Sequence, residues 1–349
     1  MSYELRRQPN GSFALYNAEL RETMHPHLGP WEEATRLYVA GSGLEELLAG
    51  QAPRPKRSRV PLPGGTAAER REVVVFDVGL GGAANALAAI ACRAGLARAG
   101  RAKELVLVSF DRDLEALAFA IGHADQLGYA RGHLDALRSV LDSGFWEAPG
   151  VRWELRHGEF PERIGDEPRR ADVVFYDPFS HRTNPAMWSL PVLEAVYRCR
   201  RPGSGQRLVT YSSAYSVRAA FLLAGYYVGD GVRLEGRPTT FAATDFAELA
   251  EPLDDRWLAR WRKDREPWPA LTAPERHKAL REALLDHPQW GQLEARAADG
   301  RGAARRAARG APERALAEAA PAKRRRPSGA GLHKGSEGSR GAPPRRGPR

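Results

Sequence analysis

Short apolar runs alternate with longer helical patterns between residues 71 and 245. Five of these runs are rich in Val, Leu and aromatic residues, a composition typical of buried strands. Five further segments have their apolar residues at helical spacing. The predicted strands are 73–78, 105–110, 151–156, 173–176 and 207–211, and the predicted helices are 83–94, 113–124, 133–143, 191–199 and 216–224. This alternation predicts an α/β fold with a mostly parallel sheet and helices on both faces.

The segments on either side of this core differ from it in composition. Residues 1–70 form a mixed N-terminal extension with a Pro/Arg-rich stretch at 52–65, which predicts a mobile loop. Residues 246–297 are predicted to be helical and to pack on the body, and they carry four tryptophans that form either a core or a docking surface, namely Trp257, Trp261, Trp268 and Trp290. Residues 298–349 contain few bulky apolar side chains. They cannot bury enough surface to offset the entropy of ordering, so we expect a disordered tail.

The net charge of +10 is unevenly distributed along the chain. Residues 301–349 contain 14 Lys and Arg residues and 3 Glu residues, whereas residues 1–300 contain 39 basic and 40 acidic residues. The tail is therefore either a non-specific contact for nucleic acid phosphates or a solvated extension without a dedicated partner. The near-neutral body does not by itself indicate nucleic acid binding.

Cysteine content and hydropathy indicate the cellular compartment of the protein. Cys92 and Cys199 lie far apart and form no CxxC motif, so the sequence predicts neither a disulfide framework nor a metal site. The N-terminus has no apolar secretory segment, and no run approaches the ~18 apolar residues of a membrane helix. We therefore expect a cytoplasmic protein without membrane association.

A glycine-rich turn joins the first predicted strand to its helix. The sequence Asp77-Val78-Gly79-Leu80-Gly81-Gly82-Ala83-Ala84-Asn85 lets the backbone turn tightly and approach a ligand closely, which predicts a site for a nucleoside-bearing cofactor. The spacing of Gly79, Gly81 and Ala84 also satisfies the dinucleotide fingerprint. A nicotinamide oxidoreductase and a tight turn without any ligand therefore remain alternatives at this point.

Acidic residues follow three of the predicted strands. Because ligands of open α/β sheets bind at the carboxyl ends of the strands, Asp111, Glu159 and Asp177 are expected on one rim. Asp111 suits the hydroxyls of a ribose, whereas Asp113 suits a helix N-cap. Glu159 is either a contact for an adenine amine or an exposed loop acid. A dinucleotide enzyme uses the first two acids, and an enzyme that methylates nitrogen uses all three.

The strand at 173–176 ends abruptly in Asp177-Pro178-Phe179. Proline stops the strand because it has no N–H to donate to the ladder. A carboxylate, a carbonyl and an aromatic face then lie together, which suits an amino group carried on a planar base. In this hypothesis Asp177 accepts an amine proton and orients the lone pair, the Pro178 carbonyl takes a second amine hydrogen, and Phe179 forms a wall.

The residues around this strand end resemble a known family. Residues 177–189 are similar to the Asp-x-Phe-(Ala/Ser)-Pro-x-x-Asn-Pro-x-(Met/Leu)-Trp-(Ser/Thr) signature of MnmC-like methyltransferases. The glycine turn resembles the Gly-Phe-Gly-Thr-Gly-x-Asn of that family. Glu22-Thr23-Met24-His25, Gly29-Pro30, Glu33-Ala34 and residues 238–244 also match. The resemblance covers roughly residues 15–270, and Asn-Pro-x-Met-Trp is its most specific element.

This resemblance implies a Rossmann-like methyltransferase domain at 71–297 that uses S-adenosyl-L-methionine. The implied reaction is methylation of the aminomethyl group on C5 of the tRNA wobble uridine. The resemblance implies an amine-facing role for Asp177, a cofactor-facing turn at Gly79, Gly81 and Asn85, a ribose contact at Asp111 and closure of the pocket by Glu33. With the assignments made from the residues themselves, the candidate catalytic residues are Asp177, Pro178 and Phe179, and the candidate cofactor contacts are Glu33, Asp77, Gly79, Gly81, Asn85, Asp111 and Glu159. Two-domain members also carry a flavin oxidoreductase, to which nothing here is similar. We therefore expect a stand-alone, monomeric methyltransferase domain that acts on tRNA beside a separate oxidoreductase.

Departures from the family pattern keep other functions open. Ala83 replaces a family glycine and adds a methyl group where the backbone is expected to meet the cofactor, and Leu80 replaces a phenylalanine. His181 replaces a proline and is either a substrate contact or a solvated side chain. Trp188 either stacks on a base or anchors its loop in the core. The alternatives are an N-methyltransferase for a small amine or a protein, and a binding protein that retains the fold without turnover.

Overall fold

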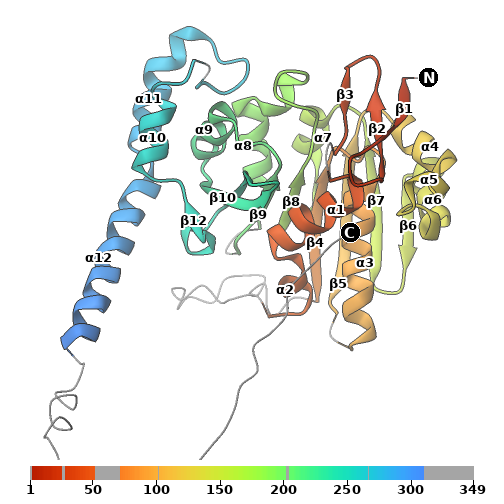
Figure 1. Cartoon of the computed structure of the whole chain (residues 1–349), viewed down its shortest axis with the longest axis horizontal. Helices are drawn as coiled ribbons and strands as arrows, with labels where there is room; N and C mark the ends of the chain where they lie inside the picture. The colour runs from red at the N-terminus through yellow and green to blue at the C-terminus, as the bar shows by residue number, and fades with distance from the viewer. Residues whose placement is uncertain are drawn as a thin grey trace, which may run out of the picture. The chain divides into compact units, whose positions relative to one another are not determined.

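The main sheet has nine strands in the order β12-β10-β11-β9-β8-β4-β5-β7-β6 (Figure 1). Its five central strands, from β9 to β7, are parallel, and the strands at both ends are antiparallel. The central strands are β4 (Glu72–Val78), β5 (Glu104–Asp111), β7 (Val151–His157), β8 (Val173–Tyr176) and β9 (Arg207–Thr210). The outer strands are β6 (Phe145–Ala148), β10 (Tyr227–Leu234), β11 (Arg237–Ala243) and β12 (Glu251–Pro252). The five predicted strands and the mostly parallel sheet are confirmed.

Helices cover both faces of this sheet, as the sequence predicts. In β4, Val73 and Val75 face one core cluster and Val74 and Phe76 face the other, because side chains alternate along a strand. The first face carries the π-helix η1 (Ala34–Ala40), α2 (Leu44–Leu48), α3 (Ala84–Arg98) and α6 (Leu134–Ser143). The second carries α7 (Phe160–Asp166), α8 (Leu190–Arg198), α9 (Tyr215–Ala224), α10 (Asp255–Trp261) and α11 (His277–Leu285).

One predicted helix, at 113–124, is interrupted. It consists of α4 (Glu115–Gly122) and α5 (Ala124–Leu127), separated at His123. The His123 backbone leaves helical geometry with a φ of −118°, and its ring stacks on Phe119, 4.0 Å between ring centroids. The Nδ1 atom of His123 also lies 2.9 Å from the carbonyl oxygen of Phe119. These local contacts compete with the regular helical pattern.

The N-terminal residues form a small antiparallel sheet that the periodicity did not reveal. It contains β1 (Tyr3–Arg7), β2 (Phe13–Asn17) and β3 (Glu22–Thr23), and α1 (Pro30–Glu33) follows it. Tyr3 and Leu15 pack with Ala116 and Ala120 of α4 in a separate apolar cluster. This packing places the N-terminal sheet beside the end of β5, at the edge where the sequence predicts ligand binding.

The computed structural model describes residues 2–25, 28–51, 71–100, 102–201, 204–265 and 267–309. Residues 1–297 form one compact unit and residues 298–349 a second. Helix α12 (Pro288–Arg309) continues past the boundary expected for the tail, because Ala and Arg are strong helix formers. The predicted loop at 52–65 and the tail beyond Arg309 lie outside the described residues. Within the described ranges no helix is both long and apolar enough to span a bilayer.

The tryptophans at the end of the first unit belong to its core. Trp257 and Trp261 are buried, and Trp268 and Trp290 pack against the same cluster. Trp261 and Trp268 meet edge to face, with ring centroids 5.5 Å apart. The helical prediction for 246–297 is only partly correct, since β12 and an irregular stretch interrupt the helices. Their side chains nevertheless attach this segment to the sheet.

Candidate active site

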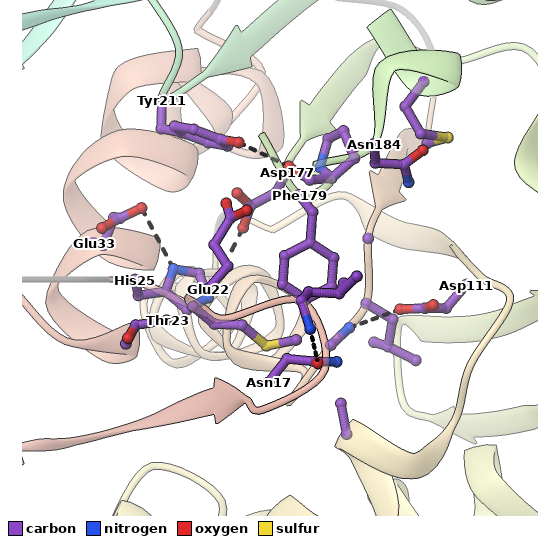
Figure 2. A pocket seen from close by; sticks show the side chains of 18 of the residues that line it. Asn17, Glu22, Thr23, His25, Glu33, Asp111, Asp177, Phe179, Asn184 and Tyr211 are labelled. Carbon is purple, nitrogen blue, oxygen red and sulfur yellow. Dashed lines mark hydrogen bonds and ion pairs between the residues drawn. The ribbon is translucent and has the colours of Figure 1, made fainter. Parts of the chain in front are cut away.

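A cavity of about 670 Å³ opens at the carboxyl ends of the parallel strands (Figure 2). The glycine turn after β4 and the ends of β5 and β8 form its floor, and the N-terminal sheet and the β10–β11 hairpin complete its walls. Eight of the site residues predicted from the sequence line this cavity, namely Glu33, Gly79, Gly81, Asp111, Glu159, Asp177, Pro178 and Phe179. The three acidic strand ends therefore share one rim, as their placement after parallel strands predicts.

Two glycines of the turn have conformations that their positions require. Gly79 has a φ of +91°, and a Cβ atom there would lie 2.6 Å from the carbonyl oxygen of Asp177. Gly81 has a φ of +50°, and its amide donates a hydrogen bond of 2.9 Å to Oδ2 of Asp111. The turn thus touches the end of β8 on one side and is held by the end of β5 on the other.

Ala83 does not face the cavity. It has a φ of +65°, is fully buried, and belongs to the apolar cluster between the sheet and α3. The expectation that its methyl group meets the cofactor is therefore wrong. The departure from glycine instead places an L-residue in a left-handed conformation, which costs about 1–2 kcal/mol.

Asn85 contacts Asp177 rather than the cavity. Its Nδ2 atom donates a hydrogen bond of 2.8 Å to Oδ2 of Asp177, and Asn85 is absent from the cavity walls. Asn85 lies in the first turn of α3, and its side chain contacts Asp177, the residue that follows β8. The structure places Asn85 where it orients the carboxylate and does not place it as a cofactor contact. Burial raises the pKa of Asp177 to about 6, against the opposing effect of His25.

Asp77 lies beneath the cavity and also departs from the prediction. It is fully buried on the face of β4 that α3 covers, and it accepts a hydrogen bond of 2.8 Å from Ser109. Ser109 in turn accepts a hydrogen bond of 2.9 Å from Nε1 of Trp153. Burial raises the pKa of Asp77 to about 7. Its position supports the strand below the turn rather than a direct cofactor contact.

The acids after β5 and β7 differ in exposure. Asp111 accepts hydrogen bonds from the amides of Gly81 and Asp113, which partly offset the rise in its pKa that burial causes. Asp113 accepts one from the amide of Glu115, the first residue of α4, but the N-cap of this helix is Leu114, so the N-cap prediction for Asp113 is wrong by one position. The Glu159 side chain is 56% exposed, and its Oε1 lies 3.4 Å from an Arg112 nitrogen. Asp111 is therefore part of the floor, whereas Glu159 lies at the mouth.

The loop after Asp177 is fixed by hydrogen bonds to its carbonyl groups. The Tyr211 hydroxyl donates to the carbonyl of Pro178 at 2.9 Å, so one lone pair of this oxygen already has a partner. Nε1 of Trp188 donates to the carbonyl of Phe179, also at 2.9 Å. Trp188 is 1% exposed and anchors the loop, so the idea that it stacks on a base is wrong. The Phe179 side chain remains on the cavity wall.

The N-terminal segment supplies two side chains that sequence reasoning did not assign. Glu22 accepts hydrogen bonds from the amide of Ser180 at 3.1 Å and from the hydroxyl of Thr183 at 2.6 Å. His25 lies between Glu33 and Asp177, with Nδ1 3.4 Å from Oε1 of Glu33 and Nε2 3.8 Å from Oδ2 of Asp177. Figure 2 shows these side chains converging from separate elements. Only the resemblance to a family marked this segment, because its contacts are with residues far away in sequence.

The charge of His25 depends on these neighbours. Burial alone would disfavour the imidazolium, but Glu33 and Asp177 outweigh this effect and raise its pKa to about 9. His25 is therefore cationic at neutral pH between two acidic side chains. No group of three or more His, Cys, Asp or Glu side chains in the described ranges is arranged to hold a metal ion.

Similarity to known proteins covers this site in part. Residues 146–244 match a family model described as S-adenosyl-L-methionine-dependent methyltransferase. The chain is 29% identical over 226 residues to the tRNA 5-methylaminomethyl-2-thiouridine biosynthesis bifunctional protein MnmC of Paracidovorax citrulli, and 30% identical over 216 residues to that of Chromohalobacter salexigens. These alignments cover 61% and 60% of this chain but only 31% and 29% of the relatives. The chain thus spans less than a third of their length.

Solved structures extend the likeness in fold. The crystal structure of MnmC2 from Aquifex aeolicus has a TM-score of 0.59 and 21% identity, and the match covers 82% of this chain and 83% of that chain. The family match at 146–244 and the MnmC relatives confirm the predicted MnmC-like resemblance and a region of the S-adenosyl-L-methionine-dependent methyltransferase type, and the structural match confirms the Rossmann-like fold.

The cavity residues fit this cofactor. Gly79 and Gly81 line the cavity with backbone that carries no side chain, and Asp111 offers a carboxylate of the kind that accepts hydrogen bonds from ribose hydroxyls. Phe110, Ala116 and Phe160 add apolar wall beside it, which suits a purine. The carboxylates on the walls complement the positive sulfonium. The volume is within the range of about 300–1,000 Å³ typical of small-molecule sites.

Proposed function

We propose that this chain, which carries an S-adenosyl-L-methionine-dependent methyltransferase domain of the MnmC-like kind, methylates the 5-aminomethyl group of the tRNA wobble uridine. The observation that carries this proposal is the position of Asp177. Its carboxylate lines the cavity beside the glycine turn and is oriented by Asn85. A basic group at this place is what transfer to an amine requires, since an ammonium has no lone pair with which to attack a methyl group.

Asp177 acts on the proton of the amine. Bound S-adenosyl-L-methionine supplies an electrophilic methyl group, and its sulfur keeps the electron pair of the broken bond. An alkylamine with a pKa of about 10, as in a lysine side chain, arrives mostly protonated. Because the pKa of Asp177 is about 6, its carboxylate is ionised at neutral pH and can accept the proton that nitrogen loses as it gains the methyl group. Asn85 donates to Oδ2, so we assign this proton to Oδ1, with the Tyr38 hydroxyl beside the same carboxylate.

Pro178 and Phe179 position the substrate in this proposal. The Pro178 carbonyl has one partner, Tyr211, and its second lone pair takes an amine hydrogen. The Phe179 side chain, on the cavity wall, packs against the uracil ring. Gly79, Gly81 and Asp111 hold the cofactor, Glu33 closes its pocket, and Glu159 contributes at the mouth.

The names of the MnmC relatives support tRNA as the substrate. A cytoplasmic location follows from that substrate. We further propose that the domain at 71–297 acts with the N-terminal extension, as a monomer, and that a separate oxidoreductase supplies the amine. The tail at 298–349 adds phosphate attraction. Deleting residues 310–349 should then reduce the salt dependence of tRNA binding, and an unchanged slope would remove the tail from this role.

A second candidate is methylation of a small cationic amine. The cavity walls carry many acidic side chains, namely Glu19, Glu22, Glu33, Asp111, Asp113, Glu159, Asp177 and Glu235, against the cations Arg112, Arg237 and His25. Such walls attract a cation, and the body of the protein lacks the excess positive charge that commonly accompanies RNA binding. This observation does not by itself select a polynucleotide.

Labelled methyl transfer separates these candidates. Bulk tRNA from cells that lack this protein and a panel of small primary amines are offered to the purified full chain with labelled S-adenosyl-L-methionine, and nucleosides are identified by mass spectrometry. Label in 5-methylaminomethyl uridine supports the proposal. Label only in small amines supports the second candidate and refutes the first.

The role of Asp177 is tested in the same assay. Asp177→Asn should keep cofactor affinity and lose at least about 100-fold in kcat, the lower end of what a positioned acid–base group contributes. The matched control is Asp142→Asn on α6, where the side chain lies away from the cavity walls. Normal turnover in the Asp177→Asn variant would refute the proton-accepting role.

A further inference from the structure

We propose that His25 is a positioning residue whose positive charge keeps Asp177 ionised beside a second buried carboxylate, that of Glu33. This inference rests on the proposed function, because it concerns the group that accepts the proton of the amine. It assigns a role to the N-terminal segment that the matched region at 146–244 does not contain.

The geometry places one cation between two acids. The imidazole nitrogens of His25 lie 3.4 Å from the Glu33 carboxylate and 3.8 Å from the Asp177 carboxylate. The three side chains are only 12%, 8% and 12% exposed. Both separations are those of ion pairs rather than tight hydrogen bonds, and Asn85 donates a hydrogen bond to Oδ2 of Asp177, the same oxygen that His25 faces. His25 therefore acts mainly through its charge.

Further titratable groups around Asp177 make this charge necessary. Tyr38 of η1, Tyr211 after β9 and Asp77 of β4 surround it in addition to His25 and Glu33. Asp77, Glu33 and Asp177 place three carboxyl groups in one poorly solvated region, where the negative charge of Glu33 raises the pKa of Asp177 and that of Asp177 raises the pKa of Asp77. His25 is the only cationic partner that faces this group among the described residues.

The backbone at His25 is consistent with a functional constraint. Its φ of +52° lies in the left-handed region, which is uncommon for residues other than glycine. Such strain costs about 1–3 kcal/mol and persists where surrounding contacts determine the conformation. Here the contact with Glu33, eight positions later, brings the imidazole over Asp177 and not toward solvent.

Substitutions of His25 and Glu33 should shift the pH dependence of kcat/KM in opposite directions. In the wild type, kcat/KM should rise with pH as Asp177 ionises. In His25→Gln the acid limb should move upward by about one pH unit or more, which corresponds to about a tenfold loss at pH values below the limb, because an opposite charge has been removed. Glu33→Gln should move the limb downward, since a like charge is removed. The double variant should lie between the single variants. His133→Gln, at the start of α6 and away from the cavity, is the control.

A structural role alone gives a different result. If His25 only holds the N-terminal segment in place, His25→Gln would lower kcat/KM by the same factor at every pH, and an unmoved limb would overturn the proposal. Thermal unfolding of each variant shows whether it is folded. Cofactor affinity, measured by calorimetry at pH 8, should change little in His25→Gln if the site remains intact.

A second readout does not depend on activity. Histidine-selective NMR of the full chain, with the His25 signal assigned by its absence in His25→Gln, should show an imidazolium that persists to about pH 9. In Glu33→Gln this titration should move to lower pH. A His25 that titrates near its ordinary value overturns the proposal, even if the protein methylates tRNA. Conversely, a persistent imidazolium with no methyl transfer to tRNA refutes the proposed function and leaves the charge cluster standing.

Discussion

Replacing Gly79 with alanine tests the contact on which the site is built. The new Cβ would lie 2.6 Å from the carbonyl oxygen and 2.9 Å from the carbonyl carbon of Asp177, both backbone atoms that cannot rotate away. The φ of +91° adds strain for any L-residue. Left-handed strain costs about 1–2 kcal/mol and overpacking about 1–3 kcal/mol, so the free energy of unfolding should fall by about 2–5 kcal/mol.

The matched control is Gly144→Ala at the end of α6. Gly144 has a φ of +71°, but the nearest atom to an added Cβ is the Leu155 carbonyl oxygen at 3.8 Å, an ordinary contact. Its substitution should therefore cost only the strain, about 1–2 kcal/mol. For a unit of this size the melting temperature should fall by about 3–8 °C in the first variant and about 2–3 °C in the second.

Cofactor binding provides the decisive comparison between these two variants. Because the clash moves the glycine turn away from Asp177, Gly79→Ala should weaken binding of S-adenosyl-L-methionine by about tenfold or more in calorimetry, whereas Gly144→Ala should leave it unchanged. Equal stability losses and equal affinities in the two variants would show that the turn and the end of β8 do not touch as described.

Three further substitutions test other parts of the site. Ala83→Gly should change the free energy of unfolding by less than about 1 kcal/mol. Glycine relieves the strain of the left-handed backbone, but it also raises the entropy of the unfolded chain and removes a buried methyl group. Tenfold tighter cofactor binding in this variant would show that residue 83 faces the cofactor. Glu22→Gln should lower the free energy of unfolding by about 1–2 kcal/mol and should lower kcat, because Ser180 loses its carboxylate partner. The exposed control Glu32→Gln should do neither. Equal effects in the two variants would contradict the role of Glu22 in fixing the loop at Ser180. Asp77→Asn should make stability less dependent on pH. The folded-state pKa of about 7 is above the usual 3.8, so the folded chain holds a proton between these values, and the contribution of Asp77 to stability is present at low pH and lost as pH rises through 7. Denaturant unfolding at pH 5 and 8 should therefore show a smaller decrease in the variant, and an identical decrease would refute this assignment.

The sheet and its acidic rim were predictable because they follow from repetition. Apolar strands that alternate with helices bring their carboxyl ends to one edge, so Asp111 and Asp177 could be placed together without knowledge of any contact. The same reasoning, carried further, would have placed Asp77 correctly. It shares a strand face with Val73 and Val75, which helices cover, and so it points into the core.

The walls of the site were less predictable because they depend on contacts between distant segments. The strands of the N-terminal sheet are short and lack a clear alternation of apolar and polar residues. His25 contacts Asp177, which is far away in the sequence. Nothing in the local sequence fixes whether Asn85 turns toward a ligand or toward a neighbouring carboxylate. Local propensity also did not anticipate Ala83 in a left-handed conformation, since the surrounding packing determines it.

The cavity is lined by residues far apart along the chain, since Met24 near the N-terminus and Thr239 in the β10–β11 hairpin both lie on its walls. During synthesis the ribosome makes Met24 early, but the pocket has no complete lining until the hairpin at its far side has emerged. Truncated or half-made chains therefore should not bind the cofactor tightly. Ligand-dependent protection against proteolysis then reports that a given molecule has finished folding, because the ligand stabilises only the state that binds it.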